Sequence, residues 1–279
     1  MKPSYIIIPL VILAALVLAV VCIRLFLLCP GKRKGIMDKY KNVKYAHRGY
    51  HGEGRAENSI SAFRAARDMG YGIELDVRLS KDGELVVFHD HTLDRVTGVS
   101  GRVVDKTAAE LAEIHLSGTE DTIPTFRQVL DLIDGAVPLL IEIKQAPGED
   151  SPVEKLVELL EGYHGDYIFE SFNPIALRRL RALAPDVPRG FLSTEYCREE
   201  RFRGKLLYWA LQGMYTNFLM RPDFIAYDKN GYAVKNLRYI RKTFDTPLLA
   251  WTIQSREEEE TALGHGFDSV IFEGYPADK

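Results

Sequence analysis

The sequence contains few cysteines and no overall excess of basic charge. Two of its three cysteines, Cys22 and Cys29, lie in or beside the first apolar run, so the chain offers no disulfide framework. Residues 1–41 hold seven Lys/Arg and one Asp, which gives them +6 and leaves −9 for the rest of a chain whose net charge is −3. An acidic domain does not attract nucleic acid through its overall field, so nucleic acid is not an expected partner. Any phosphate must be held by local cations.

Signatures of a protein nucleophile are also missing. The chain has no Gly-x-Ser-x-Gly motif and no convincing Cys/His pair.

Charge is absent from the first apolar run, residues 3–23. As a helix these residues span about 31 Å, enough to cross a bilayer. A cleaved signal peptide is the competing interpretation, but the basic residues before the run are limited to Lys2 and no Ala-x-Ala precedes a cleavage point. We expect an uncleaved anchor.

Basic residues gather on the C-terminal side of this run. The positive-inside rule then predicts a single-pass membrane protein whose C-terminal domain lies in the cytoplasm. We divide the chain into an anchor and basic linker, residues 1–41, and a C-terminal domain, residues 42–279. The basic residues concerned are Arg24, Lys32, Arg33, Lys34, Lys39, Lys41 and Lys44.

Two strand-like runs carry acidic residues on one face. Along Ile73–Val77, Glu74 and Asp76 project to the side opposite the apolar residues, because side chains alternate along a strand. The run Leu139–Lys144 repeats the pattern with Glu142 and Lys144. Three carboxylates without cysteine indicate a hard divalent cation, Mg²⁺ or Ca²⁺, with Mn²⁺ also possible.

The order of strand-like and helical patterns predicts the fold class. Nine strand-like runs occur, and the turn at residues 80–84 is too short for a parallel crossover, so two of the runs form a hairpin. The remaining eight, with helices between most of them, predict an α/β fold, a (β/α)8 TIM barrel with a small insertion over residues 99–124. Asn58 is expected to cap the helix that follows it. Further helices are expected over residues 111–114, 126–133, 153–160, 174–183, 206–219, 234–244 and 257–263.

The ordered motifs of residues 42–276 resemble the glycerophosphodiester phosphodiesterase family. The motifs are His47-Arg48-Gly49, Glu57-Asn58, Glu74-x-Asp76-Val77, Lys81-Asp82-Gly83, His89-Asp90, Glu142-x-Lys144, Ser171-Phe172 and Trp251-Thr252. The resemblance implies hydrolysis of a glycerophosphodiester to sn-glycerol 3-phosphate and an alcohol. It also implies that the neighbouring glycerol hydroxyl attacks the phosphate first, so that water opens a cyclic phosphate afterwards.

Roles can then be assigned to individual residues. His47 and His89 suit a proton relay between the attacking and leaving oxygens. Arg48 and Lys144 are expected to bind phosphate, and Glu74, Asp76 and Glu142 to hold the cation. Glu57 either reaches the site or favours a helix N-terminus, and Trp251 either packs in the core or lines the substrate pocket.

The sequence departs from the family pattern at two places. Gln254 stands where Asn is common, and Phe272-Glu273-Gly274-Tyr275-Pro276 replaces the usual Thr-Asp before the last Tyr-Pro. We expect both to lie away from the proton and metal chemistry and to affect substrate preference.

Two alternative functions stay open. One is a lysophospholipase D acting on membrane lysophospholipids, and the other is a barrel that binds phosphodiesters without hydrolysing them. The sequence does not indicate the alcohol head group or the oligomeric state.

Overall fold

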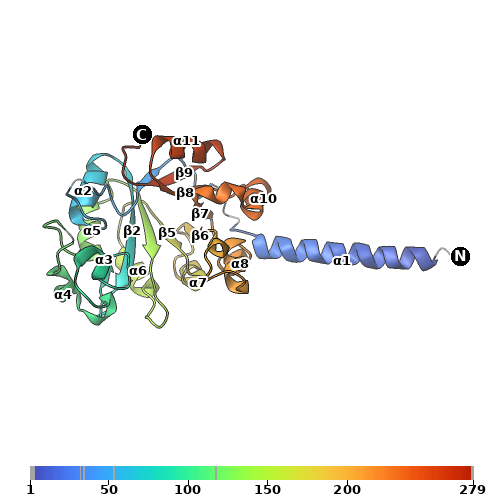
Figure 1. Ribbon diagram of the computed structural model, residues 1–279, viewed down its shortest axis with the longest axis horizontal. Coiled ribbons are helices and arrows are strands. Elements are labelled where there is room, and N and C mark those ends of the chain that lie inside the picture. Colours follow the sequence, from blue (N-terminus) through green and yellow to red (C-terminus); the bar gives the residue numbers. More distant parts are fainter. Residues whose placement is uncertain (1–3, 32, 34, 53, 117, 278–279) are drawn as a thin grey trace.

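The computed structural model describes residues 4–277, except Lys32, Lys34, Glu53 and Ser117. Pro3, where the expected anchor starts, and the linker residues Lys32 and Lys34 therefore lie outside the described residues. A barrel domain forms one part of the molecule, and a long helix projects from it beside α8 (Leu206–Gln212) and α10 (Lys235–Phe244) (Figure 1).

The strands of the described residues form one closed sheet. β1 pairs in parallel with both β9 and β2, which closes the barrel, and the β2–β3 pair is antiparallel. The expected TIM barrel of eight parallel strands and one hairpin arm is confirmed. The strands are β1 (Lys44–Ala46), β2 (Gly72–Leu79), β3 (Leu85–Val87), β4 (Leu139–Ile143), β5 (Tyr167–Ser171), β6 (Arg189–Ser193), β7 (Phe224–Asp228), β8 (Leu248–Ile253) and β9 (Ser269–Phe272).

Helices surround the sheet. Three of the expected helices, α5, α6 and α7, have the predicted bounds because their apolar residues recur with helical spacing. The helices around the barrel are α2 (Ile60–Asp68), α5 (Phe126–Ile133), α6 (Val153–Leu160), α7 (Pro174–Leu183), α8 (Leu206–Gln212), α9 (Asn217–Met220), α10 (Lys235–Phe244) and α11 (Arg256–Gly264), and α1 (Ser4–Leu28) precedes them. Shorter ones are α3 (Asp94–Thr97), α4 (Ala108–Ala112), η1 (Val103–Asp105), η2 (Tyr196–Arg198) and η3 (Lys229–Ala233).

Two local predictions about helices are wrong. The single helix expected over residues 206–219 is divided into α8 and α9, because Met214 takes a left-handed conformation with φ of 59°. The cap of α2 is Ser59, whose hydroxyl accepts a hydrogen bond from the Ala62 N–H. Asn58 instead directs its side chain into the barrel, toward Asp76.

Alternation along the strands separates two cores. Ile73, Leu75 and Val77 of β2 pack outward among the helices. Residues facing inward fill the barrel, among them Tyr45 and Phe224. Gly190 leaves the space that the Phe224 ring occupies, because a Cβ there would lie 2.1 Å from the ring. The insertion shares a separate small core with β3 and the residues that follow it, built from Val86, Phe88, Leu93, Val103, Leu111, Leu116 and Ile123.

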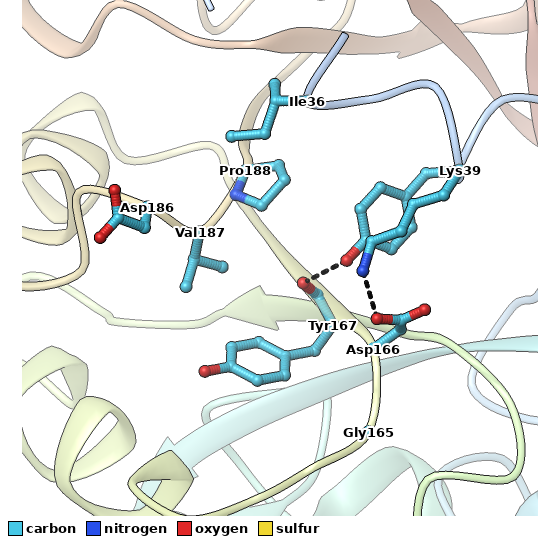
Figure 2. Close-up of a pocket in the computed structure, with 9 residues that line it drawn as sticks. Ile36, Lys39, Gly165, Asp166, Tyr167, Asp186, Val187 and Pro188 are labelled. Atoms are coloured by element: carbon cyan, nitrogen blue, oxygen red, sulfur yellow. Dashed lines mark hydrogen bonds and ion pairs between the residues drawn. The ribbon is translucent and has the colours of Figure 1, made fainter.

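The linker after α1 packs against the N-terminal end of the barrel. Tyr40 is buried among the inward-facing residues and donates a hydrogen bond to the Tyr167 carbonyl. Lys39 forms an ion pair with Asp166, just before β5 (Figure 2). Arg33 Nε donates to Asp223 Oδ1 at 2.9 Å, just before β7. The linker is therefore packed on the barrel, while the boundary between residues 41 and 42 stays a prediction.

The last turns of α1 contact the domain. Leu28 is fully buried, and the Phe26 and Phe218 rings lie 5.3 Å apart. Arg24 donates to the Asn236 side chain at 3.1 Å. Most of the helix is exposed and strongly apolar, since residues 7–28 have a mean hydropathy of 3.0. This length and composition suffice to cross a membrane, and a signal sequence has the same properties.

Candidate active site

Three acidic side chains converge inside the barrel. Glu74 and Asp76 project inward from β2, and the strand register sets Asp76 beside Glu142 of β4. All three are buried, and one oxygen of each lies within 4.8 Å of the others. The sequence-predicted carboxylate cluster is therefore assembled by strand pairing alone.

Ionising all three carboxylates at once is unfavourable in free energy. Burial and the neighbouring carboxylates Asp76 and Glu142 raise the pKa of Glu74 well above its ordinary value. Burial, with Asp76 adding to it, raises the pKa of Glu142 to about 7 although Lys144 opposes the shift. Buried oxygen donors that lie close together fit a divalent cation such as Mg²⁺ or Ca²⁺.

Asp76 is the one carboxylate of the cluster that the surrounding cations keep ionised. Burial favours its neutral form, but Lys144, His89 and Arg48 hold the pKa of Asp76 well below its usual range. Lys144 Nζ lies 3.2 Å from Asp76 Oδ1 and 2.7 Å from Glu142 Oε1. The Asn58 amide donates to Asp76 Oδ2 at 2.7 Å.

Arg48 lies on the other side of the cluster. Its backbone N–H donates to Glu74 Oε2 at 2.8 Å, and its Nε lies 3.6 Å from Asp76 Oδ2. The residue has a left-handed φ of 54°, followed by Gly49 at 80°. A Cβ on Gly49 would lie 2.9 Å from Ala62, so the close packing of α2 requires glycine there.

Each predicted catalytic histidine is held at Nδ1 by a carboxylate. His47 follows β1, and its Nδ1 lies 2.6 Å from Glu273 Oε2. His89 Nδ1 lies 2.7 Å from Asp90 Oδ1. Burial is the main cause that lowers the pKa of His47, and it lowers that of His89 to about 4. The Nε2 atom of each ring is therefore the one left to meet a substrate.

A comparison with known protein families covers the part of the chain that holds these residues. Residues 47–273 match the model of the glycerophosphoryl diester phosphodiesterase family. The chain belongs to this family. It is therefore an enzyme that hydrolyses glycerophosphodiesters, as the motifs predict.

Relatives and solved structures agree with this assignment. A glycerophosphodiester phosphodiesterase of Caldanaerobacter subterraneus subsp. tengcongensis is 32% identical over 247 residues, covering 83% of this chain and 93% of the relative. A crystal structure of the Thermotoga maritima enzyme is 28% identical with a TM-score of 0.64, covering 83% and 94%. An Oleispira antarctica phosphodiesterase, solved with the product sn-glycerol-3-phosphate, shares the fold with a TM-score of 0.69 at 24% identity and covers 84% and 94%.

In this phosphodiesterase, Glu57 takes part in a chain of ion pairs. Its carboxylate accepts from Arg48 Nη1 at 2.8 Å and from both terminal nitrogens of Arg95. Arg95 Nε also donates to Asp90 Oδ2 at 2.6 Å. The surroundings of the two histidines are thereby joined. Contact between Glu57 and the substrate stays a prediction.

Trp251 belongs to an aromatic wall beside Lys144. Its ring meets Phe172 edge to face with centroids 5.5 Å apart, and Lys144 Nζ lies 5.8 Å from the Phe172 centroid. The indole Nε1 is buried without a hydrogen-bond partner among the described residues. Phe172 is not among the sequence-predicted site residues, although the Ser171-Phe172 motif marks its position.

The expectation that both sequence departures avoid the proton chemistry is wrong. Glu273 contacts His47, and the Gln254 side chain donates to Glu273 Oε1 at 2.9 Å. His51 also lies here, with Nε2 3.6 Å from Glu273 Oε2. Closure of the barrel brings the end of β9 against β1, which no local pattern indicates.

We predict that Glu273→Gln lowers the pKa of His47. The carboxylate stabilises the imidazolium, and a hydrogen bond to a charged group contributes about 1.5–3 kcal/mol, equivalent to about 1 to 2 pH units. The titration of His47, followed by imidazole nitrogen NMR, should move to lower pH by this amount.

The matched control is Glu257→Gln, an exposed position on α11 where the same chemical change should leave His47 unaffected. An unaltered His47 titration in Glu273→Gln would contradict the assigned role of Glu273.

Proposed function

We propose that the chain is a membrane-anchored, metal-dependent glycerophosphodiesterase that releases sn-glycerol 3-phosphate by acid/base catalysis of His47 and His89. The observation that carries this proposal is a pair of imidazoles that each make a hydrogen bond from Nδ1 to a carboxylate. Both imidazoles are also influenced by the charges of Asp76 and Arg48. This arrangement leaves the Nε2 atom of each ring available for proton transfer to or from one anionic substrate, which supports the proposal.

The two histidines divide the proton transfers. His47 Nε2 accepts the proton of the attacking glycerol hydroxyl, and Glu273 stabilises the imidazolium that forms. His89 donates a proton to the leaving alcohol. We give His47 the base role because it adjoins Arg48, the expected phosphate contact. A bound phosphate anion raises the pKa of His89 and so favours the protonated form that an acid requires.

The phosphate would lie between two positively charged side chains. Arg48 offers a forked contact, and Lys144 a point charge. A divalent cation held by Glu74, Asp76 and Glu142 would supply the charge that polarises a phosphoryl oxygen. Trp251 Nε1, which has no partner in the described part of the chain, supports a hydrogen bond to the substrate beside the aromatic wall.

The alternatives differ in substrate or in turnover. A lysophospholipase D would use the same groups on a lysophospholipid, and a binding barrel would use only the cations. Three outcomes are separated by two assays with and without chelator: release of glycerol 3-phosphate from deacylated phospholipids, and release of lysophosphatidic acid from lysophospholipids. The absence of metal-dependent release from every substrate would favour the binding barrel.

We predict that Glu74→Ala weakens binding of the divalent cation by about 100-fold or more, because changes even to residues that only support a ligand cost about 10–100-fold. Turnover at limiting metal should fall with it, while the thermal unfolding midpoint of the barrel is retained. Calorimetric titration with Mg²⁺, Ca²⁺ and Mn²⁺ measures the affinity, with the exposed Glu161→Ala as control. Full affinity in Glu74→Ala would remove this residue from the metal site.

We predict that His89→Ala loses far more activity on an ordinary glycerophosphodiester than on one that carries nitrophenol. An alkoxide needs a proton in order to leave, whereas nitrophenolate does not, and a general acid contributes about 10²–10⁴-fold. His47→Ala should impair both substrates alike.

Selective rescue of His47→Ala by the nitrophenol substrate would reverse the two roles. Near wild-type turnover of the ordinary substrate by both variants would end the two-histidine mechanism.

The contacts of α1 support an uncleaved anchor. Cleavage of a signal peptide after residue 28 would remove Arg24, Phe26 and Leu28 from the places they occupy on the domain. With basic residues on its C-terminal side, the anchor favours a cytoplasmic domain.

We predict that protease added outside intact cells leaves the domain uncut and that the full-length chain is recovered in the membrane fraction. Cells permeabilised before digestion serve as the control. External cleavage, or a shortened soluble form, would contradict the anchored cytoplasmic topology.

A further inference from the structure

A cavity of about 720 Å³ lies where α1 joins the barrel. One side of it is apolar and comes from Leu25 and Phe26 of α1, together with Phe244 at the end of α10. Pro30 and Pro185 add to this surface. The cavity lies at the N-terminal end of the barrel, because its lining includes linker residues and residues that come shortly before β6 and β7. The two catalytic histidines lie at the opposite end of the barrel.

The other side of the cavity is strongly cationic. Four arginines line it and no carboxylate does so among the described residues. One of the four, Arg33, is paired with Asp223 outside the lining. The remaining positive charge comes from Arg181, Arg189 and Arg221.

Arg189 is unusual among these arginines because its side chain is buried. The residue is only 4% exposed, its Nε donates to the Met220 carbonyl, and its Nη1 has no hydrogen-bond partner among the described residues. Burial, with Arg33 and Arg181 adding to it, lowers the pKa of Arg189 to about 10 although Asp223 opposes the shift. A buried guanidinium with an unused donor is costly unless an anion pairs with it.

The position of the cavity relative to a bilayer follows from the length of α1. The uncharged residues 4–23 of α1 cover about 30 Å, which matches the hydrocarbon core of about 30 Å. Arg24 is the first charged residue after them and is held by Asn236. Leu25 and Phe26 therefore lie at the boundary with the headgroup layer when α1 spans a bilayer, close to the level of the lipid phosphates.

We propose that this cavity binds an anionic phospholipid, with its phosphate on Arg181, Arg189 and Arg221 and its acyl chain along Leu25 and Phe26. The proposal rests on the proposed membrane anchoring and not on the hydrolytic chemistry. Arginine binds phosphate oxygens through paired N–H donors, and an anionic leaflet supplies the ligand at high local concentration. The lipid would join the anchor to the barrel.

The test uses the full chain in detergent micelles and dioctanoyl phosphatidic acid, which is a phosphate monoester and cannot be cleaved as a diester. Native mass spectrometry measures its binding against dioctanoyl phosphatidylcholine. We expect phosphatidic acid to bind at least about tenfold more tightly, a difference of about 1.4 kcal/mol. An excess of glycerol 3-phosphate should not displace it, because the hydrolytic site is elsewhere.

Arg181→Glu reverses one cavity charge on the exposed surface of α7, and we expect it to weaken phosphatidic acid binding by about tenfold. The matched control is Arg178→Glu, which makes the same change on the same helix outside the cavity lining and should alter binding by less than about twofold. Arg221→Ala is a second cavity variant. Turnover of a soluble glycerophosphodiester by each variant reports the hydrolytic site separately.

Equal binding of the two lipids, or equal weakening by Arg181→Glu and Arg178→Glu, would overturn the proposal. Displacement of the lipid by glycerol 3-phosphate would place it in the hydrolytic site. Competition by inorganic phosphate at the same concentration as the lipid would reveal a small-anion site and would also overturn the assignment to a lipid.

Discussion

The ionisation of one buried carboxylate, that of Asp76, constrains much of the site. A carboxylate without exposed surface is unfavourable in its charged form unless cations and donors surround it. Asn58, Arg48 and Lys144 supply them from three different segments. The left-handed turn at Arg48, the position of Asn58 and the inward direction of Lys144 all serve this requirement. The two histidines then lie near a fixed negative charge.

Much of this arrangement could be predicted from the sequence because it depends on short-range periodicity. Strand alternation sets Glu74 and Asp76 on one face, and apolar spacing determines the bounds of α5, α6 and α7. Contacts across the closed barrel could not be predicted in this way. Glu273 is 226 residues from His47, and the two meet only because β9 pairs with β1. The predicted cap of α2 failed for a similar reason, because Asp76 attracts the Asn58 amide.

The departures from the family pattern consequently have a different meaning from the one expected. Glu273 and Gln254 form a hydrogen-bonded pair that holds His47, so the two positions depend on each other. A shorter acidic side chain at residue 273 would need a different supporting group. Glu273 and Gln254 therefore orient the His47 imidazole through contacts particular to this chain. The positions of the three carboxylates and Lys144 are instead set by the pairing of β2 with β4.

The packed linker limits how far the domain can move relative to α1. A flexible chain as long as residues 29–41 would let the barrel move by about 20 Å, since such a chain spans about 5–6 Å times the square root of its length. Because Arg33, Lys39 and Tyr40 are bound to the barrel, that freedom is lost. When α1 spans a bilayer, the end of the barrel that holds the two histidines is therefore kept at a nearly constant distance from the membrane surface and at a nearly constant tilt. The enzyme would then meet its substrate by lateral diffusion within one thin layer of solution next to the membrane.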